Sequence, residues 1–164
     1  MNEKRSLLRH FLAALAYRTQ KALRYAPSDF GDFHAARHVR SPHELIRHMD
    51  SVLGYACTFF IGGSYRPPVF PDFASAIAHF HEMLARLAQQ LEAGSELQGI
   101  TEENLLQGPL SDAMTHAGQL AMLRRLAGSP VPPENFVFAE IKVGNLGPAQ
   151  PLPADPDRDW PERP

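Results

Sequence analysis

Two histidines and one aspartate are the residues whose types and spacing point most directly to chemistry. His48 and His116 each fall on the apolar stripe of a predicted helix. A buried neutral histidine needs a hydrogen-bond partner or a metal ion. Asp112 precedes His116 by four residues, so both project from one helical face. Two histidines and a carboxylate on neighbouring helices can form an open metal site that leaves positions for water or substrate.

The carboxylate of this candidate site has competing explanations. Asp112 lies in the first turn of its predicted helix, where the helix dipole favours an acid for purely structural reasons. Glu44, four residues before His48, is an alternative ligand, but it also completes a capping box with Ser41. We therefore predict a metal site formed by His48, Asp112 and His116, with Glu44 as the fallback carboxylate.

The other reactive side chains favour structural roles. Cys57 has no basic residue one helical turn away that would lower the pKa of its thiol, so we expect it to be buried and inert. His81 borders an apolar seam and is expected to pack there. His34 and His38 lie in a loop beside arginines and are expected at the surface. The chain shows no phosphate-binding loop and no zinc-finger spacing.

Four stretches of the chain predict the helices that must position these groups. Ser41 followed by Pro42 marks a clear helix start, and Gly62 with Gly63 marks the matching end. Before the fourth stretch, residues 101–106 are predicted to add one short turn. The predicted helices cover about residues 3–25, 42–61, 72–93 and 108–127.

The link between the second and third helices constrains the topology. Residues 61–70 can span about 33 Å if extended. The second helix should be about 28 Å long, so the link can run the length of the bundle. Its Gly-Gly and Pro-Pro pairs suit an extended crossover. The pattern therefore favours parallel second and third helices.

Composition bounds the class of protein. The chain has 164 residues, 44% of them hydrophobic, which predicts one globular domain with a real core. A formal net charge of -2 supplies no general field for nucleic acid, and no apolar run approaches the ~20 residues of a membrane helix. The basic residues of the first helix are expected on its solvated face. The single cysteine agrees with a cytoplasmic location.

The end of the chain has a different character from the rest. Residues 136–141 form a short apolar stretch that could lie against the bundle. The last twenty residues hold many prolines and few apolar groups. We therefore predict a helical bundle over residues 1–147 and an extended or disordered tail over residues 148–164.

Several segments resemble the DinB-like family of helical bundles. Residues 41–49 resemble the start of that family's second helix, where a histidine follows a leucine-rich first turn. Residues 111–120 are similar to its fourth helix, with a His-x-Gly-Gln stretch that begins at His116. Residues 133–136, followed by Ile141 and Gly144, are similar to one branch of the family. The resemblance extends from the first helix to about Gly147.

This resemblance implies an all-α, up-down-down-up four-helix bundle with a divalent metal ion. In the family the ion is held by one histidine of the second helix and two of the fourth. The first of these carries over to His48, and the last carries over to His116. The remaining one falls on Asp112, where this sequence departs from the pattern. A carboxylate can bind zinc, nickel, manganese or iron, so the departure leaves the identity and the presence of the metal open.

Two functions are compatible with these features. The first is a metal-dependent enzyme that activates a water or a thiol for attack on a small molecule, as a thiol transferase or a hydrolase. The second is a non-catalytic bundle that binds a small ligand or a partner protein. A homodimer is expected in either case, with Tyr65, Val69 and Phe70 as exposed apolar residues.

Overall fold

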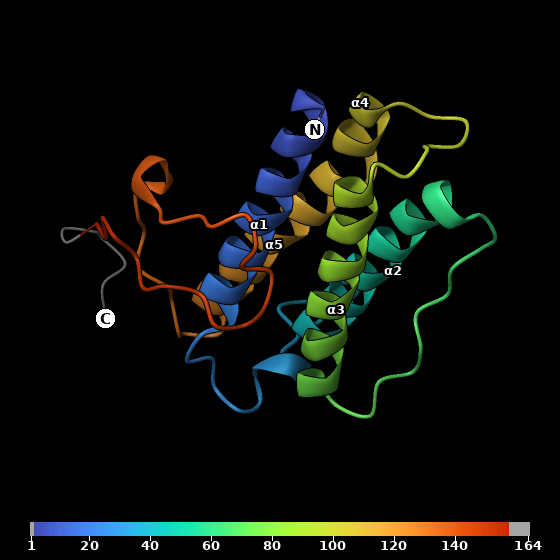
Figure 1. Cartoon of the computed structure of the whole chain (residues 1–164). Helices are drawn as coiled ribbons and strands as arrows, with labels where there is room; N and C mark the ends of the chain where they lie inside the picture. The colour runs from blue at the N-terminus through green and yellow to red at the C-terminus, as the bar shows by residue number, and fades with distance from the viewer. Residues whose placement is uncertain (1, 158–164) are drawn as a thin grey trace.

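The computed structural model describes residues 2–157, and its regular structure in that range is helical. Four long helices form a bundle, and one short helix precedes the last of them (Figure 1). The elements are α1 (Glu3–Leu23), α2 (Pro42–Ile61), α3 (Phe73–Ala93), α4 (Glu102–Leu105) and α5 (Ser111–Leu126). Among the described helices, none is both long and apolar enough to cross a membrane.

Local capping signals set the ends of α2 and α3. The Ser41 hydroxyl accepts from the Glu44 amide, and the Glu44 carboxylate accepts from the Ser41 amide, which confirms the predicted capping box. Asp72 caps α3 through the Ser75 amide. Gly94 ends α3 in the left-handed conformation that glycine adopts without strain.

The core lies between the four long helices, which pack in a ring. α2 packs against α3 and α5, and α1 packs against α5 and α3. The fully buried side chains come from all four helices and include Leu12, Ile46, Leu53, Phe80, Leu84 and Leu120. Such burial contributes about 1.5–3 kcal/mol for each large apolar side chain, which makes this ring the main source of stability.

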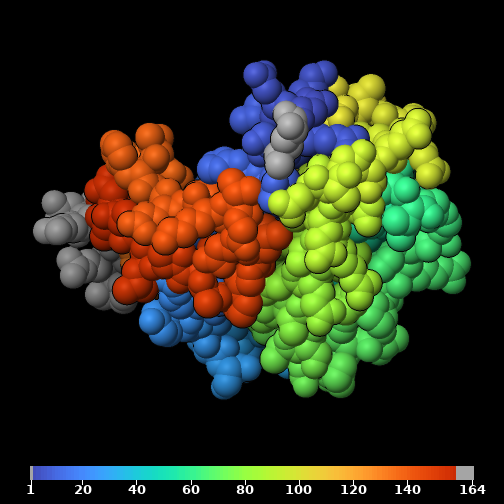
Figure 2. All heavy atoms as spheres, viewed as in Figure 1, coloured from blue at the N-terminus to red at the C-terminus, as the bar shows by residue number. Residues whose placement is uncertain are grey.

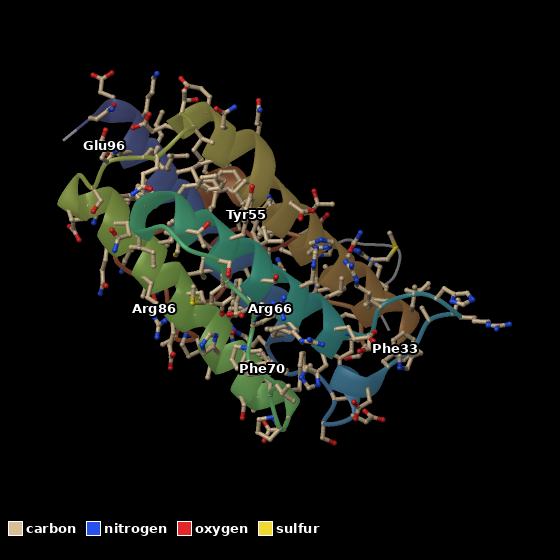
Figure 3. The ribbon with its side chains drawn as sticks, turned by 90° about the vertical axis from the view of Figure 1, so that its right-hand side faces the viewer. Phe33, Tyr55, Arg66, Phe70, Arg86 and Glu96 are labelled. Atoms are coloured by element: carbon tan, nitrogen blue, oxygen red, sulfur yellow. The ribbon has the colours of Figure 1, made fainter. Side chains whose placement is uncertain are left out.

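α2 and α3 run in the same direction. The His43 ring at the start of α2 lies 6.0 Å from the Phe73 ring at the start of α3. At the opposite end, the Gln98 amide, just after α3, donates to the Phe59 carbonyl near the end of α2. The link of residues 62–72 therefore travels along the side of the bundle (Figures 1 and 3).

The link is held against α2 and α3 by two aromatic side chains. A Cβ atom at Gly54 would lie 2.1 Å from the Tyr65 ring, so only glycine in α2 admits that ring. Phe70, which Figure 3 places on the link, lies 5.2 Å from the His79 ring of α3. Tyr65, Val69 and Phe70 were all expected to be exposed. Tyr65 and Phe70 are instead half-buried, and Val69 is 89% exposed.

The predicted start of the fourth helix at Gly108-Pro109 coincides with a kink in the chain. α4 corresponds to the short turn predicted for residues 101–106, and a π-helical turn (Leu106–Leu110) joins it to α5. Gly108 takes the one non-helical conformation in that turn, at φ −92° and ψ −105°, and Pro109 is accommodated inside it. α4 and α5 therefore form a rod with a kink at Gly108, which agrees with the predicted short turn followed by a longer helix.

The segment after α5 lies along α1, and Figure 2 shows it spread over that side of the bundle. Glu134 accepts from the Tyr17 hydroxyl at 2.7 Å and pairs with Lys21. The Arg18 guanidinium lies 3.8 Å from the centre of the Phe136 ring. Residues 148–157 are without helix and form one isolated bridge, whereas the remainder of the predicted tail, residues 158–164, lies outside the described residues.

The basic residues of α1 face acids as well as solvent. Arg5 lies 3.0 Å from Glu102, and Arg9 lies 2.9 Å from Glu92. Lys21 pairs with Glu134, whose carboxylate is fully buried. These ion pairs of Arg5, Arg9 and Lys21 therefore connect α1 to α4, to the end of α3 and to the segment after α5.

Candidate metal centre

His48, Asp112 and His116 converge between α2 and α5. The His48 Nε2 atom lies 3.6 Å from Asp112 Oδ2, and His116 Nε2 lies 3.3 Å from Asp112 Oδ1. The two imidazole rings are 4.7 Å apart, centre to centre. One candidate ligand atom from each residue lies within 4.8 Å of the others. The described residues therefore contain a group that could hold a metal ion, at the three positions predicted from the sequence.

Gln119 fixes the orientation of the His116 ring. His116 Nδ1 lies 2.7 Å from Gln119 Oε1, one turn further along α5. An amide oxygen only accepts, so Nδ1 carries the proton and donates it. In the neutral ring, Nε2 then presents its lone pair toward Asp112 and His48. A hydrogen bond to the second ring nitrogen is the usual way in which a protein orients a metal-binding histidine.

The buried His116 Nε2 atom lacks a hydrogen-bond partner among the described residues. Its near neighbour, Asp112 Oδ1, bears lone pairs as well. Two acceptor atoms at this distance repel each other unless a proton or a cation lies between them. A divalent ion satisfies both atoms at once, and its preference for imidazole nitrogen and carboxylate oxygen matches this donor set. The residues present therefore fit such an ion.

The three side chains differ in their exposure to solvent. The side chain of His116 is 9% exposed, that of His48 is 32% exposed and that of Asp112 is 47% exposed. Burial, and then the positive charge of Arg40, lower the pKa of His48, although Asp112 acts to raise it. A lowered pKa favours the neutral imidazole that binds metals. The exposed side of Asp112 leaves room for water or substrate.

The kinked rod explains how the two histidines reach the same level. When two antiparallel helices lie level, a residue before the midpoint of one helix faces a residue after the midpoint of the other. His48 and His116, however, both precede the midpoints of their helices, α2 and α5. When α4 and the π turn are counted with α5, His116 falls after the middle of the rod. Asp112 lies in the first turn of α5, where the helix dipole also favours a carboxylate, so its position suits both roles considered from the sequence.

An apolar pocket of about 710 Å³ opens beside the centre. His116 and Gln119 form part of its wall, so the candidate metal site and the pocket share a boundary. The loop before α2 provides another part of the wall through Ala35, Ala36, His38, Val39 and Arg40. His38, although exposed as predicted, belongs to this wall and has a positive φ of 65°. Strained backbone of this kind is common where a loop shapes a binding site.

The other candidates from the sequence lie elsewhere. Glu44 is held in the capping box of α2, so it is not part of the centre. Cys57 is buried, and burial raises the pKa of its thiol to about 11, as expected for an inert side chain. His81 is buried, and its Nδ1 atom donates to the Leu146 carbonyl at 2.6 Å.

Sequence reasoning missed a buried polar cluster on the other side of α2. Asp50 is completely buried and accepts from Tyr65 Oη and His79 Nδ1, both at 2.7 Å. An aspartate on the apolar stripe of a helix was an available signal, although its partners come from two distant segments. Gln119 was also missed as an orienting residue, although its spacing of three from His116 was visible.

Comparison with known proteins gives no match: no protein-family model, curated protein or solved structure corresponds to this chain. What the centre can do therefore follows from its donor atoms and from its surroundings.

Proposed function

We propose that this chain is a DinB-like protein that binds one divalent metal ion and acts on a small molecule, as a thiol transferase or a hydrolase. The observation that carries the proposal is the buried Nε2 atom of His116, which is oriented by Gln119 and faces the Asp112 carboxylate. His48 adds a second imidazole from the facing helix. Such a site needs a cation for electrostatic balance.

The arrangement of the helices supports a DinB-like, up-down-down-up topology within this proposal. The α2 and α3 helices are parallel, as the contacts at both of their ends indicate. The end of α1 meets the end of α5, where Arg124 donates to the Ala22 and Arg24 carbonyls. Arg9 near the start of α1 meets Glu92 at the end of α3, so α1 opposes α3.

The residues of the centre would hold zinc, nickel, manganese or iron. Such an ion, when bound, lowers the pKa of a coordinated water or thiol and polarises a carbonyl. His48 and His116 would supply nitrogen ligands, Asp112 would supply oxygen, and Gln119 would keep His116 in the correct tautomer. The apolar wall of the pocket would keep bulk water from one side of the substrate.

A non-catalytic bundle that binds a small ligand is the second candidate. It is favoured by the aspartate at position 112, where the resemblance leads us to expect a histidine. In that case protons would balance the centre in place of a metal ion. Metal binding therefore separates the two candidates.

Isothermal titration of metal-free protein with zinc, nickel and manganese tests the proposal. We expect one equivalent of at least one metal to bind, and we expect His116→Ala to abolish that binding. His10→Ala is the matched control, because His10 is exposed on α1 and should leave binding unchanged. Absence of stoichiometric binding, or binding that survives in His116→Ala, would contradict the proposal.

Oligomeric state and location complete the proposal. A homodimer remains our expectation, and Val69 supplies exposed apolar surface for it. Light scattering at micromolar concentration should give twice the monomer mass, and a monomer mass would contradict it.

The buried, unpaired Cys57 supports a reducing, cytoplasmic location.

A further inference from the structure

The pocket beside the metal centre has a wall with two chemical regions. Its larger region is apolar and comes from both α2 and α5, through Leu45, Met122, Leu123 and Leu126. Met122 and Leu126 are 60% and 59% exposed, and they lie next to each other on α5 in the wall of one pocket, so they form a continuous apolar surface. A ligand with an apolar body would cover them.

The polar region of the wall carries positive and neutral groups. Arg40 enters from the loop before α2 and lines the same pocket as the neutral side chains of His116 and Gln119. Among the described residues of the wall there is no carboxylate, and Arg40 forms no ion pair or hydrogen bond with the part of the chain that the structure describes. Arg40 and His116 line the same pocket, and the charge of Arg40 lowers the pKa of His48, so Arg40 lies near the candidate metal site. An uncompensated guanidinium beside an apolar surface favours an anion.

We propose that the pocket binds a small organic acid, with its apolar chain or ring against α2 and α5 and its anionic group on Arg40. This inference rests on the proposed function, because it assigns the pocket to the substrate of the neighbouring centre. Arg40 is then a binding residue that selects for the charge of the substrate. A guanidinium forms paired hydrogen bonds with a carboxylate, so it also fixes the direction in which the substrate enters.

The dimensions of the pocket agree with a compact substrate. Its volume of about 710 Å³ lies in the range typical of small-molecule sites, about 300–1,000 Å³. A nucleotide would require several cationic or amide donors for its phosphates, whereas the described wall offers a single arginine. A single carboxylate on an apolar body therefore matches the wall better than a polyanion.

Octanoate and its neutral amide, octanamide, are suitable probes because they share the apolar chain and differ in charge. Both are titrated calorimetrically into the full chain in the presence of a chelator, so that a carboxylate cannot bind through a metal ion. We expect octanoate to bind at least about tenfold more tightly than octanamide, as a charge-assisted pair in a partly apolar site would produce. Arg40→Gln should remove that preference, and Arg47→Gln, an exposed arginine outside this pocket, should retain it.

A second variant tests the apolar wall and does not depend on Arg40. Met122→Asp places a negative charge in the pocket at an exposed position that should not affect folding, and it should abolish octanoate binding. Equal affinity for the two probes, unchanged octanoate binding in Arg40→Gln, or no octanoate binding at millimolar concentration would overturn the inference. The metal titration with His116→Ala is a separate measurement, so failure of the metal proposal is distinguishable from failure of this one.

Discussion

At the scale of single residues, the centre depends on which nitrogen of His116 carries the proton. The Gln119 carbonyl oxygen accepts from Nδ1, and this leaves Nε2 as a lone pair toward Asp112. Without Gln119, the proton could move from Nδ1 to Nε2, and the Nε2–H group would donate a hydrogen bond to the Asp112 carboxylate. Nε2 would then be hydrogen-bonded to Asp112 and would have no lone pair available for a metal ion.

Replacing Gln119 with alanine should therefore weaken metal binding without removing a ligand. Loss of an orienting partner typically costs about 10–100-fold in metal affinity, so we expect a decrease in that range in Gln119→Ala. Gln119→Glu should restore the acceptor and bind at least as tightly as the original chain. Calorimetric titration checks both variants, with the exposed Gln89→Ala of α3 as control. Unchanged affinity in Gln119→Ala would show that the ring is oriented by its packing alone.

His81 makes a second residue-scale prediction, which concerns pH. Burial lowers the pKa of His81, and the hydrogen bond to the Leu146 carbonyl opposes this only in part. An unfolded histidine has a pKa of about 6.5. The folded chain therefore resists protonation of His81, so stability is fully present above about pH 6.5 and is lost as the pH falls through the lower folded pKa.

His81→Asn should flatten this pH dependence. Asparagine places a donor near the position of Nδ1 and does not titrate, so the variant should be less stable at pH 7.5 and should lose less stability between pH 7.5 and 5.5. Thermal unfolding across that range measures the effect, and His10→Ala should follow the original profile. An identical slope in His81→Asn would mean that other groups cause the acid sensitivity.

At the scale of elements, the segment after α5 is attached to α1 by a buried carboxylate. The Glu134 side chain is fully buried, accepts from Tyr17 and pairs with Lys21, whose side chain is 11% exposed. Burial lowers the pKa of Lys21, and Glu134 acts to raise it. A buried charge that loses its partner is costly, because its own desolvation is then uncompensated.

Glu134→Gln should consequently destabilise the fold by about 2 kcal/mol or more, even though glutamine is nearly isosteric. The variant keeps an acceptor for Tyr17 but leaves Lys21 without a countercharge. Glu134→Gln combined with Lys21→Met should recover much of the loss, because both charges are then absent. Urea unfolding of the single and double variants checks this, and additive losses in the double variant would exclude a coupled pair.

The elements also show which features the sequence could predict. The ends of α2 and α3 were predictable, because Ser41, Asp72 and Gly94 act on amides or carbonyls within a few residues. The face shared by Asp112 and His116 followed from helical spacing alone. The break at Gly108-Pro109 was predictable, because glycine and proline interrupt a helix locally, but the π turn that joins α4 to α5 across this break was not. Glu134 was missed because its partners lie more than a hundred residues away.

At the scale of the whole molecule, residues 150–157 contact the end of α1 and the segment that follows α5. Arg24, just after α1, donates to the carbonyls of Gln150 and Pro151 at 2.6 and 3.0 Å. The Asn135 amide donates to Asp155, and the Asp157 amide donates to Pro133. These contacts lie outside the helical core, so they add stability without defining the bundle.

Removal of residues 149–164 should therefore lower stability while leaving the helical bundle intact. The truncated chain loses both acceptors of Arg24 and the backbone pairs of residues 155 and 157. At about 1 kcal/mol for each net hydrogen bond, partly offset by the entropy of a freed chain end, we expect a decrease in Tm of roughly 3–8 °C. Far-ultraviolet circular dichroism should show unchanged helix content.

A double-variant cycle locates the source of that loss. Arg24→Gln in the full-length chain should reproduce part of the decrease in Tm, because it removes the same guanidinium contacts from the other side. In the truncated chain the same substitution should cost much less, since its acceptors are already absent. If Arg24→Gln costs the same in both chains, Arg24 stabilises α1 independently of the chain end. In that case residues 149–157 contribute through their own backbone pairs with Pro133 and Asn135.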